Sequence, residues 1–102
     1  MEIIIQATDY KATNKVKKFV KNHVEKLQAL NEQIMEGRVL LKVDNDTTTG
    51  ENNVCEIKLA IPGNDLYASK RGKSIAESVI KSVDALKHQL DHVKTNRDHK
   101  RG

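Results

Sequence analysis

Hydrophobic residues in this chain alternate with polar ones in several segments, a spacing that is typical of half-buried strands. Residues 2–8, 38–44 and 54–61 show this alternation. The apolar faces of the three segments are Ile3, Ile5 and Ala7; Val39, Leu41 and Val43; and Cys55, Ile57, Leu59 and Ile61. A tight turn predicted at residues 62–65 leads into a short fourth strand, which Leu66 and Ala68 open.

Two longer stretches carry apolar residues at intervals of three and four, the period of an α-helix. The first follows a cap at Thr13 or Asn14, and Gly37 marks its exit. Its apolar positions are Val16, Phe19, Val20, Val24, Leu27 and Leu30. The second opens with a capping box, in which Ser74 and Glu77 satisfy each other's backbone N–H groups. Its apolar positions are Ile75, Val79, Val83, Leu86, Leu90 and Val93.

The resulting element order is β-α-β-β-β-α. Because every strand has one apolar face and each helix one apolar stripe, the economical packing is a four-stranded sheet with both helices on one face. We therefore predict a single α+β domain, similar in layout to a double-stranded RNA-binding domain. The domain is expected to span residues 1–94, followed by a basic, disordered tail at residues 95–102.

Composition favours a small soluble domain. The 102 residues are 37% hydrophobic and 31% charged. No apolar run approaches the ~20 residues that a membrane-spanning helix needs, and the N-terminal segment lacks the basic region of an export signal. The single cysteine, Cys55, excludes an internal disulfide and fits a reducing compartment. We therefore expect a cytoplasmic protein with no membrane partner.

Charge is distributed unevenly along the chain. Residues 11–30 carry six lysines and one acid, and residues 66–102 carry nine lysines and arginines and four acids. Residues 31–65 show the opposite balance, with three basic and seven acidic residues. Two basic helices beside an acidic sheet predict one positive face, which suits a polyanion. The alternative that these lysines are only the usual polar residues of solvent-exposed helix faces stays open at this point.

Helical geometry, at about 100° per residue, places the cations of this predicted face. Those opposite or beside the apolar stripe of the first helix are Lys15, Lys17, Lys18, Lys21 and Lys26. Those on the second helix are Lys81, Lys87, His88, His92 and Lys94, and Lys70, Arg71 and Lys73 precede it. Aromatic residues make up only 3% of the chain, so few platforms exist for base stacking. The phosphates of folded or double-stranded nucleic acid are the expected ligand.

Three patterns appear in order along residues 1–94. They are Thr13 followed by Val16, Phe19 and Val20 and closed by Lys26-Leu27; the stretch IPGNDLYAS at residues 61–69; and Asp84-x-Leu86-x-x-Gln89-Leu90. With the element order, this set resembles the short ribosome hibernation-promoting factors, also called ribosome-associated inhibitors.

The resemblance implies a stress or stationary-phase factor that binds the small ribosomal subunit in the channel for mRNA and tRNA. It implies that translation is blocked by occlusion, with ribosomal RNA as the partner, no cofactor, no small-molecule substrate and a monomer off the ribosome. By position, the family's RNA-facing basic residues fall on Lys17, His23, Lys26, Arg71, His88 and His92. Neighbouring cations complete the expected RNA-binding set, namely Lys18, Lys70, Lys73, Lys81, Lys87 and Lys94.

The sequence departs from the family pattern at several of these positions. His23, His88 and His92 stand where arginine or lysine is usual, so charge there is partial near neutral pH. Ala76 stands where the family usually has an aromatic residue. These departures weaken the residue-by-residue transfer of the family's RNA-facing positions to this sequence. They leave the predicted positive face intact.

Two alternative functions stay open. One is a double-stranded RNA-binding module, although the strand at residues 2–8 precedes that domain's usual order; the other is a protein-interaction regulator of an alternative sigma factor.

His88 and His92 have the spacing of a metal-binding pair, but no third ligand is evident and no metal is expected. Cys55 shares the apolar face of its strand and is expected to be buried. No nucleophile–base pair or phosphate-binding glycine loop is evident, so neither catalytic residues nor enzyme activity are expected.

Overall fold

The computed structural model describes the backbone of residues 1–45 and 48–101, and the side chains through His92. Strands β1 (Glu2–Thr8), β2 (Glu36–Val43), β3 (Asn53–Ile61) and β4 (Asn64–Gly72) form one sheet in the order β1-β2-β3-β4. Helix α1 (Asn14–Glu25), continued by the 3₁₀ turn η1 (Lys26–Ala29), connects β1 to β2, and α2 (Ile75–Arg101) follows β4. β1 pairs with β2 in parallel and the other pairs are antiparallel, so the predicted α+β order is confirmed.

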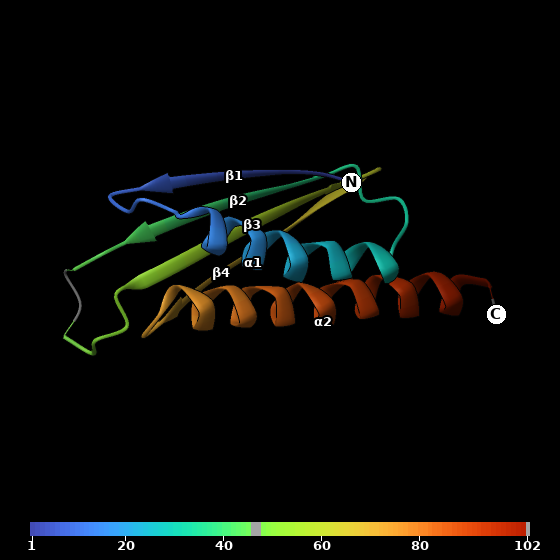
Figure 1. The fold of residues 1–102 in the computed structure, drawn as a ribbon. Helices are drawn as coiled ribbons and strands as arrows, with labels where there is room; N and C mark the ends of the chain where they lie inside the picture. Colours follow the sequence, from blue (N-terminus) through green and yellow to red (C-terminus); the bar gives the residue numbers. More distant parts are fainter. Residues whose placement is uncertain (46–47, 102) are drawn as a thin grey trace.

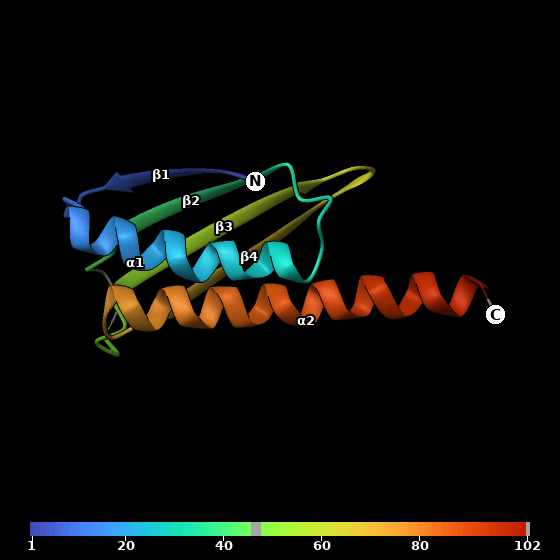
Figure 2. The same ribbon diagram turned by 45° about the vertical axis from the view of Figure 1, so that its right-hand side comes forward.

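Both helices cover one face of the sheet and leave the other open (Figure 1). α2 packs along β3 and β4, and α1 lies beside it (Figure 2). The two helices run in the same direction, so both begin at the same end of the molecule. We call the exposed sides of α1, η1 and α2 the helical face. The strand residues that point away from the helices, centred on Ile4, Leu40, Glu56 and Tyr67, form the open sheet face.

The hydrophobic core lies between the helices and the sheet. Its fully buried members from α1, η1, the strands and α2 are Val20, Val24, Leu27, Leu41, Cys55, Ile57, Leu59, Val79 and Leu86. Complete burial of a side chain such as Leu59 contributes about 1.5–3 kcal/mol. Burial also raises the pKa of the Cys55 thiol to about 12, so this residue is an inert part of the core, as predicted. Ala7 is exposed and does not join the predicted apolar face.

Helix α1 begins as predicted and ends earlier than predicted. The Val16 amide donates to Thr13 Oγ1 at 3.3 Å, and Thr13 has the extended backbone of a capping residue. The helix tightens into η1 after Glu25, and Leu30, which was expected in the core, is 42% exposed. Leu30 belongs to the connection towards β2, beyond the helical turns that face the sheet.

Gly37 lies inside β2, so the prediction that it marks the exit of the first helix is wrong. A Cβ at this position would lie 3.3 Å from both Val24 Cγ1 and Met1 Sδ. Glycine allows β2 to pass close to α1, a requirement of packing that alternation along the chain does not reveal.

Strand β4 is longer than the short strand predicted. It spans nine residues and follows a two-residue turn, in which Gly63 has a φ of +85°. The strand therefore includes Lys70 and Arg71. Because neighbouring residues of a strand point to opposite faces, this extension separates two cations that the sequence placed on one surface.

Helix α2 starts at a close junction with β4. A Cβ on Gly72 would lie 2.8 Å from the Ser78 backbone nitrogen. The Glu77 amide donates to Ser74 Oγ at 3.1 Å, which confirms one half of the capping box. The α2 backbone is helical to Arg101, through most of the segment predicted as a tail, whereas Gly102 and the side chains from residue 93 onward lie outside the described part. The division into residues 1–94 and 95–102 stays a prediction.

Candidate nucleic-acid interface

The helical face carries a group of exposed lysines that form no ion pair with a described carboxylate. They are Lys15, Lys17, Lys18, Lys21 and Lys26 on α1 and η1, and Lys70, Lys73 and Lys87 on or next to α2. An ammonium group that has no partner within the protein can bind a phosphate without first breaking an ion pair. These side chains are therefore the most available cations in the part of the chain that the structure describes.

The start of α1 is an unfavourable place for so much positive charge. Its first turn contains no acid, although the positive end of the helix dipole favours Asp or Glu there. Lys15 and Lys17 each oppose the dipole by about 0.3–1 kcal/mol at low ionic strength. A polyanion bound at this end would remove the repulsion, so this arrangement suits ligand binding better than helix stability.

Helix α2 presents one flank to β4 and the other to α1. Gln89 Nε2 donates to the Tyr67 carbonyl at 2.8 Å, and Lys81 Nζ donates to the Arg71 carbonyl at 3.2 Å. These two bonds place their flank of the helix against the outer edge of β4. Lys87 lies on the opposite flank, at about 100° per residue, and so faces α1.

The same geometry applies to α1, which runs in the same direction over the same face of the sheet. Phe19, His23 and Lys26 lie on the flank that turns towards α2, in agreement with the contact between η1 and α2. Lys17 lies on the other flank and Lys18 on the outward side. Lys26 and Lys87 thus lie on the two sides of the junction between the helices.

His23 combines core packing with one free ring nitrogen. The side chain is half-buried, and its ring lies 4.2 Å from that of Phe19, measured between centroids. Its Nδ1–H donates to the Phe19 carbonyl, at 3.0 Å. Only Nε2 is left to contact an RNA phosphate, so any role in binding would use that atom.

His88 and His92 lie on the β4 side of α2. Both are exposed, and with Asn64, Leu66 and Gln89 they line a groove of about 380 Å³. Within the described residues, no three side chains of the metal-ligating types gather into a candidate site. An RNA that contacts these histidines and the helix junction must therefore lie across α2.

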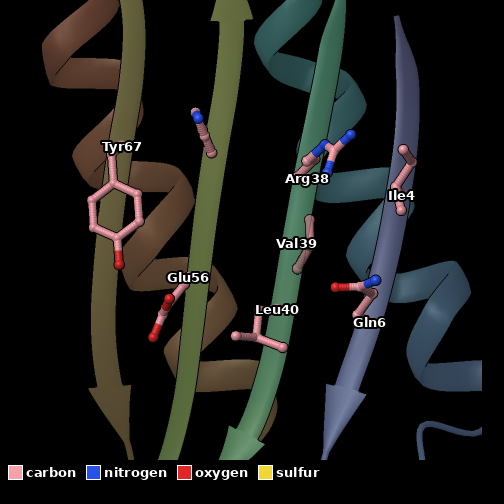
Figure 3. A pocket seen from close by; sticks show the side chains of 8 residues that line it. Ile4, Gln6, Arg38, Val39, Leu40, Glu56 and Tyr67 are labelled. Carbon is pink, nitrogen blue, oxygen red and sulfur yellow. The ribbon is translucent and has the colours of Figure 1, made fainter.

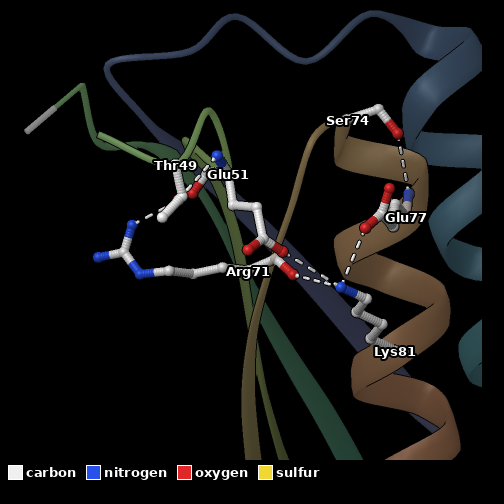
Figure 4. Close-up of polar contacts among 6 residues, drawn as sticks. All are labelled: Thr49, Glu51, Arg71, Ser74, Glu77 and Lys81. Atoms are coloured by element: carbon white, nitrogen blue, oxygen red, sulfur yellow. Dashed lines mark hydrogen bonds and ion pairs between the residues drawn. The ribbon is translucent and has the colours of Figure 1, made fainter. Parts of the chain in front are cut away.

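Two cations of the expected RNA-binding set, Lys81 and Arg71, already have carboxylate partners, and Figure 4 shows those of Lys81. Lys81 Nζ lies 3.3 Å from Glu51 Oε2 and 2.9 Å from Glu77 Oε1. Arg71 Nη2 lies 2.6 Å from Asp44 Oδ2, and Arg71 Nη1 donates to the Glu51 carbonyl at 3.4 Å. The hydrogen bonds to Glu77 and Glu51 raise the pKa of Lys81, and the bond to Lys81 lowers the pKa of Glu77. Asp44 and Glu51 thus tie the β2–β3 connection to β4 and α2.

The structure divides the three cations that precede α2. Lys70 lies on the helical side, in a groove of about 370 Å³ that Lys81, Asp84 and His88 also line. Arg71 pairs in register with Val54, on the alternate set of strand residues, and its guanidinium extends to the end of β2. Arg71 is therefore not part of the helical face. Lys73 lies in the connection to α2, and the side chain of Lys94 lies outside the described residues.

The open sheet face, part of which Figure 3 shows, differs from the helical face because its basic side chains are paired with carboxylates. Ile4, Leu40 and the 54% exposed Tyr67 surround a shallow pocket of about 200 Å³. The pairs on this face are Arg38 with Glu36 at 2.8 Å, Lys42 with Glu56 at 2.9 Å, and Lys58 with Asp65 at 3.5 Å. The hydrogen bond from Lys42 lowers the pKa of Glu56. A phosphate would have to break these pairs before it could bind here.

The sequence does not reveal the carboxylate partners of Lys81 and Arg71. Glu51 and Asp44 are 30 and 27 residues away from them along the chain. No local spacing indicates such contacts. The acidic character of residues 31–65 is the one available signal, and it does not say which cations these acids meet.

The fold and these two faces define a small α+β protein with a cationic helical side suited to RNA backbone. No helix in the described part is long and apolar enough to span a membrane. A family model described as Sigma 54 modulation protein / S30EA ribosomal protein matches residues 3–98, and the chain belongs to this family. The family consists of ribosome-associated factors and not of enzymes, as the sequence predicts.

Individual relatives agree with this assignment. The chain is 24% identical over 91 residues to the ribosome hibernation promotion factor of Deinococcus radiodurans, which covers 89% of this chain and 48% of that protein. The chain thus spans about half the length of that relative. Its fold is similar to the N-terminal domain of Thermus thermophilus Protein Y, with a TM-score of 0.78 and 17% identity over 91% of this chain and 99% of that one. A ribosomal subunit interface protein from Coxiella burnetii gives a TM-score of 0.81 and 13% identity, covering 93% and 99%.

Proposed function

We propose that this protein is a cytoplasmic ribosome hibernation factor that binds the small ribosomal subunit through its helical face. Bound there, it occupies the channel for mRNA and tRNA and blocks translation under stress or in stationary phase. The observation that carries the proposal is the group of unpaired lysines on both helices, opposite a sheet face whose charges are paired. Membership of a family of ribosome-associated factors supports the choice of polyanion.

Binding in this proposal depends on phosphate contacts and not on base recognition. Each contact releases counterions from the RNA, so log K falls by roughly 0.7–0.9 per unit of log salt for each phosphate neutralised. The domain measures 48 × 28 × 18 Å along its principal axes, a body large enough to exclude mRNA or tRNA from the space it fills. Inhibition then requires no chemical step and no cofactor.

Two other functions make different predictions. The family description also contains sigma 54 modulation, which would require binding to a protein. A general double-stranded RNA-binding module would bind duplex RNA as tightly as it binds the small subunit. Neither has an observation in its favour equal to the unpaired lysines together with the family's link to the ribosome.

Sedimentation tests the proposal and its alternatives together. The protein is mixed with purified small ribosomal subunits, either empty or loaded with mRNA and P-site tRNA, and separated on a sucrose gradient. We expect it to migrate with empty subunits and to be displaced from loaded ones. Protein that stays at the top of the gradient contradicts ribosome binding, and equal binding to loaded subunits contradicts a site in the channel.

The same experiment includes arms for the two alternatives. Free duplex RNA is added as a competitor in one arm, and a sigma-54 RNA polymerase replaces the ribosome in another. Displacement by modest amounts of duplex RNA would favour the general RNA-binding module. Retention by the polymerase, without retention by the subunit, would favour the sigma-factor regulator.

A further inference from the structure

One corner of the molecule has cations like those of the helical face but holds them in internal ion pairs. It lies where β4 meets α2 and the β2–β3 connection, around Lys81, Arg71 and Glu51 (Figure 4), and it includes Asp44, the carboxylate partner of Arg71. Glu51 is central, because its carboxylate contacts Lys81 and its carbonyl accepts a bond from Arg71. No other cation of the helical face has a partner from the sheet side among the described residues.

We propose that this corner is a further phosphate-binding site, and that Asp44 and Glu51 form an internal anionic cover that RNA phosphate must displace. The inference rests on the proposed binding of RNA by the helical face. Carboxylate and phosphate oxygens accept hydrogen bonds from the same guanidinium and ammonium donors. The two kinds of anion therefore compete for Arg71 and Lys81.

The cover is weak enough to be displaced. The side chains of Lys81 and Glu51 are 43% and 37% exposed, and those of Arg71 and Asp44 are 44% and 32% exposed. Water and salt screen ion pairs at such exposure, so they hold their partners weakly. A surface with closely spaced phosphates offers a much higher local density of negative charge than two carboxylates do.

The neighbouring cations strengthen the uncovered site. Lys70 lines the same groove as Lys81 and has no ion pair with a described carboxylate, and Lys73 lies in the connection that follows Arg71. Removal of Glu51 would thus leave Lys81 with Glu77 as its one carboxylate partner among the described residues, beside Lys70 in the same groove and near the connection that holds Lys73. Dense polyanions would gain all of these contacts, whereas a single small anion would gain one or two. The cover therefore favours RNA over small anions in solution.

The test measures the affinity of the full chain for purified small ribosomal subunits after Glu51→Gln, which keeps the size of the side chain and removes its charge. We expect binding about two- to fivefold tighter, the range set by the strength of an exposed ion pair. The matched control is Asp65→Asn, which removes one charge from the Lys58 pair of the open sheet face. The control should change the affinity less, because it uncovers no cation of the helical face.

A double-variant cycle tests whether the gain passes through Lys81. Lys81→Gln should weaken binding more in the Glu51→Gln background than in the wild type, because Lys81 then keeps only Glu77 as a carboxylate partner and is more available to RNA. Equal costs in the two backgrounds, or no gain beyond that of Asp65→Asn, would overturn the cover. Asp44→Asn provides a second, independent variant if Glu51→Gln lowers the melting temperature. A wild type that does not bind the subunit overturns the proposed function itself, a result distinct from failure of the cover alone.

Discussion

The helical face and the open sheet face both carry lysines and arginines, but only one of them leaves these cations unpaired. On the open sheet face, Arg38, Lys42 and Lys58 each lie within 3.5 Å of a carboxylate oxygen. On the helical face, lysines such as Lys18, Lys26 and Lys87 have no such partner among the described residues. The two faces therefore differ in the availability of their cations more than in the presence of cations.

The two architectures explain this difference. Strands bring side chains of neighbouring strands within about 4.5–5.5 Å of each other, so an acidic and a basic residue on adjacent strands meet readily. Within one helix, the ion-pair partner of a side chain lies three or four residues away along the chain. Helix α1 has a single acid, Glu25, among many lysines, so most of its lysines have no possible partner on their own element.

The largest expected effect comes from a triple variant that neutralises three cations of the helical face together. Lys18→Gln, Lys26→Gln and Lys87→Gln together should weaken binding to small ribosomal subunits about a hundredfold near 0.1 M salt and flatten the log–log salt slope by about 2–3. Arg38→Gln, Lys42→Gln and Lys58→Gln make the matched control, with the same change in net charge. Affinity is measured by fluorescence anisotropy over a series of salt concentrations. Equal losses for the two triple variants would show that net charge alone drives binding, and would end the distinction between the faces.

A smaller effect is expected from Gly72→Ala, which disturbs the junction between the sheet and α2. The new Cβ would lie 2.8 Å from the Ser78 backbone nitrogen, so α2 or β4 must shift. We expect the free energy of unfolding to fall by about 1–3 kcal/mol, the usual cost of overpacking. Chemical denaturation monitored by circular dichroism measures this loss. Gly50→Ala is the control, because nothing lies within 4 Å of a Cβ there, although its φ of +81° adds some backbone strain. A loss in Gly72→Ala no larger than that in Gly50→Ala would contradict the close junction as a source of instability.

A pH series separates the paired open sheet face from the unpaired helical face. The pKa of Glu56 is lowered from its ordinary value of 4.5 by the hydrogen bond from Lys42, so this pair stabilises the fold above that value. The contribution is lost as the pH falls through the lowered pKa. Lys42→Gln should therefore reduce the free energy of unfolding near neutral pH, and this reduction should shrink as the pH falls below 4.5 and through the lowered pKa of Glu56. Lys18→Gln, which breaks no pair, should show no such dependence. An equal and pH-independent loss in both variants would contradict the role of the ion pair.

The smallest effect is expected from Tyr67→Ala, at the most exposed aromatic side chain of the open sheet face. We expect the affinity for the small subunit to stay within about twofold of the wild type, because the side chain lies away from the helices, and stability to change by about 0.5 kcal/mol or less. The measurement is the same anisotropy titration. A large loss of affinity would show that the open sheet face also contacts the ribosome, and would make both faces part of the interface.

The sequence predicts the fold well because its periodicities are strong and local. Alternation in β3 and the three-four spacing in α2 each identify an element and its buried side. The errors arise where packing between distant segments decides. Gly37 resembles a helix stop in the sequence but is a strand residue that lets α1 approach β2. Leu30 continues the apolar spacing but lies beyond the turns that contact the sheet.

The candidate site could be predicted only as a set of charges. The spacing on α1 and α2 places most lysines correctly, because helical geometry is regular. The separation of Lys70 from Arg71 depends on the length of β4, and the ion pair of Lys81 with Glu51 depends on a loop 30 residues away. The separation and the ion pair both depend on how distant strands pair. The spacing of residues within one segment carries no information about that pairing.

The bonds from Gln89 and Lys81 to the Tyr67 and Arg71 carbonyls also affect how the protein behaves at high concentration. An uncapped edge of a sheet can recruit strands from other molecules and so begin aggregation. On β4, an incoming strand would have to remove two side chains of α2 before it could pair along this edge. Helix α2 therefore also protects the sheet against the addition of a strand at β4.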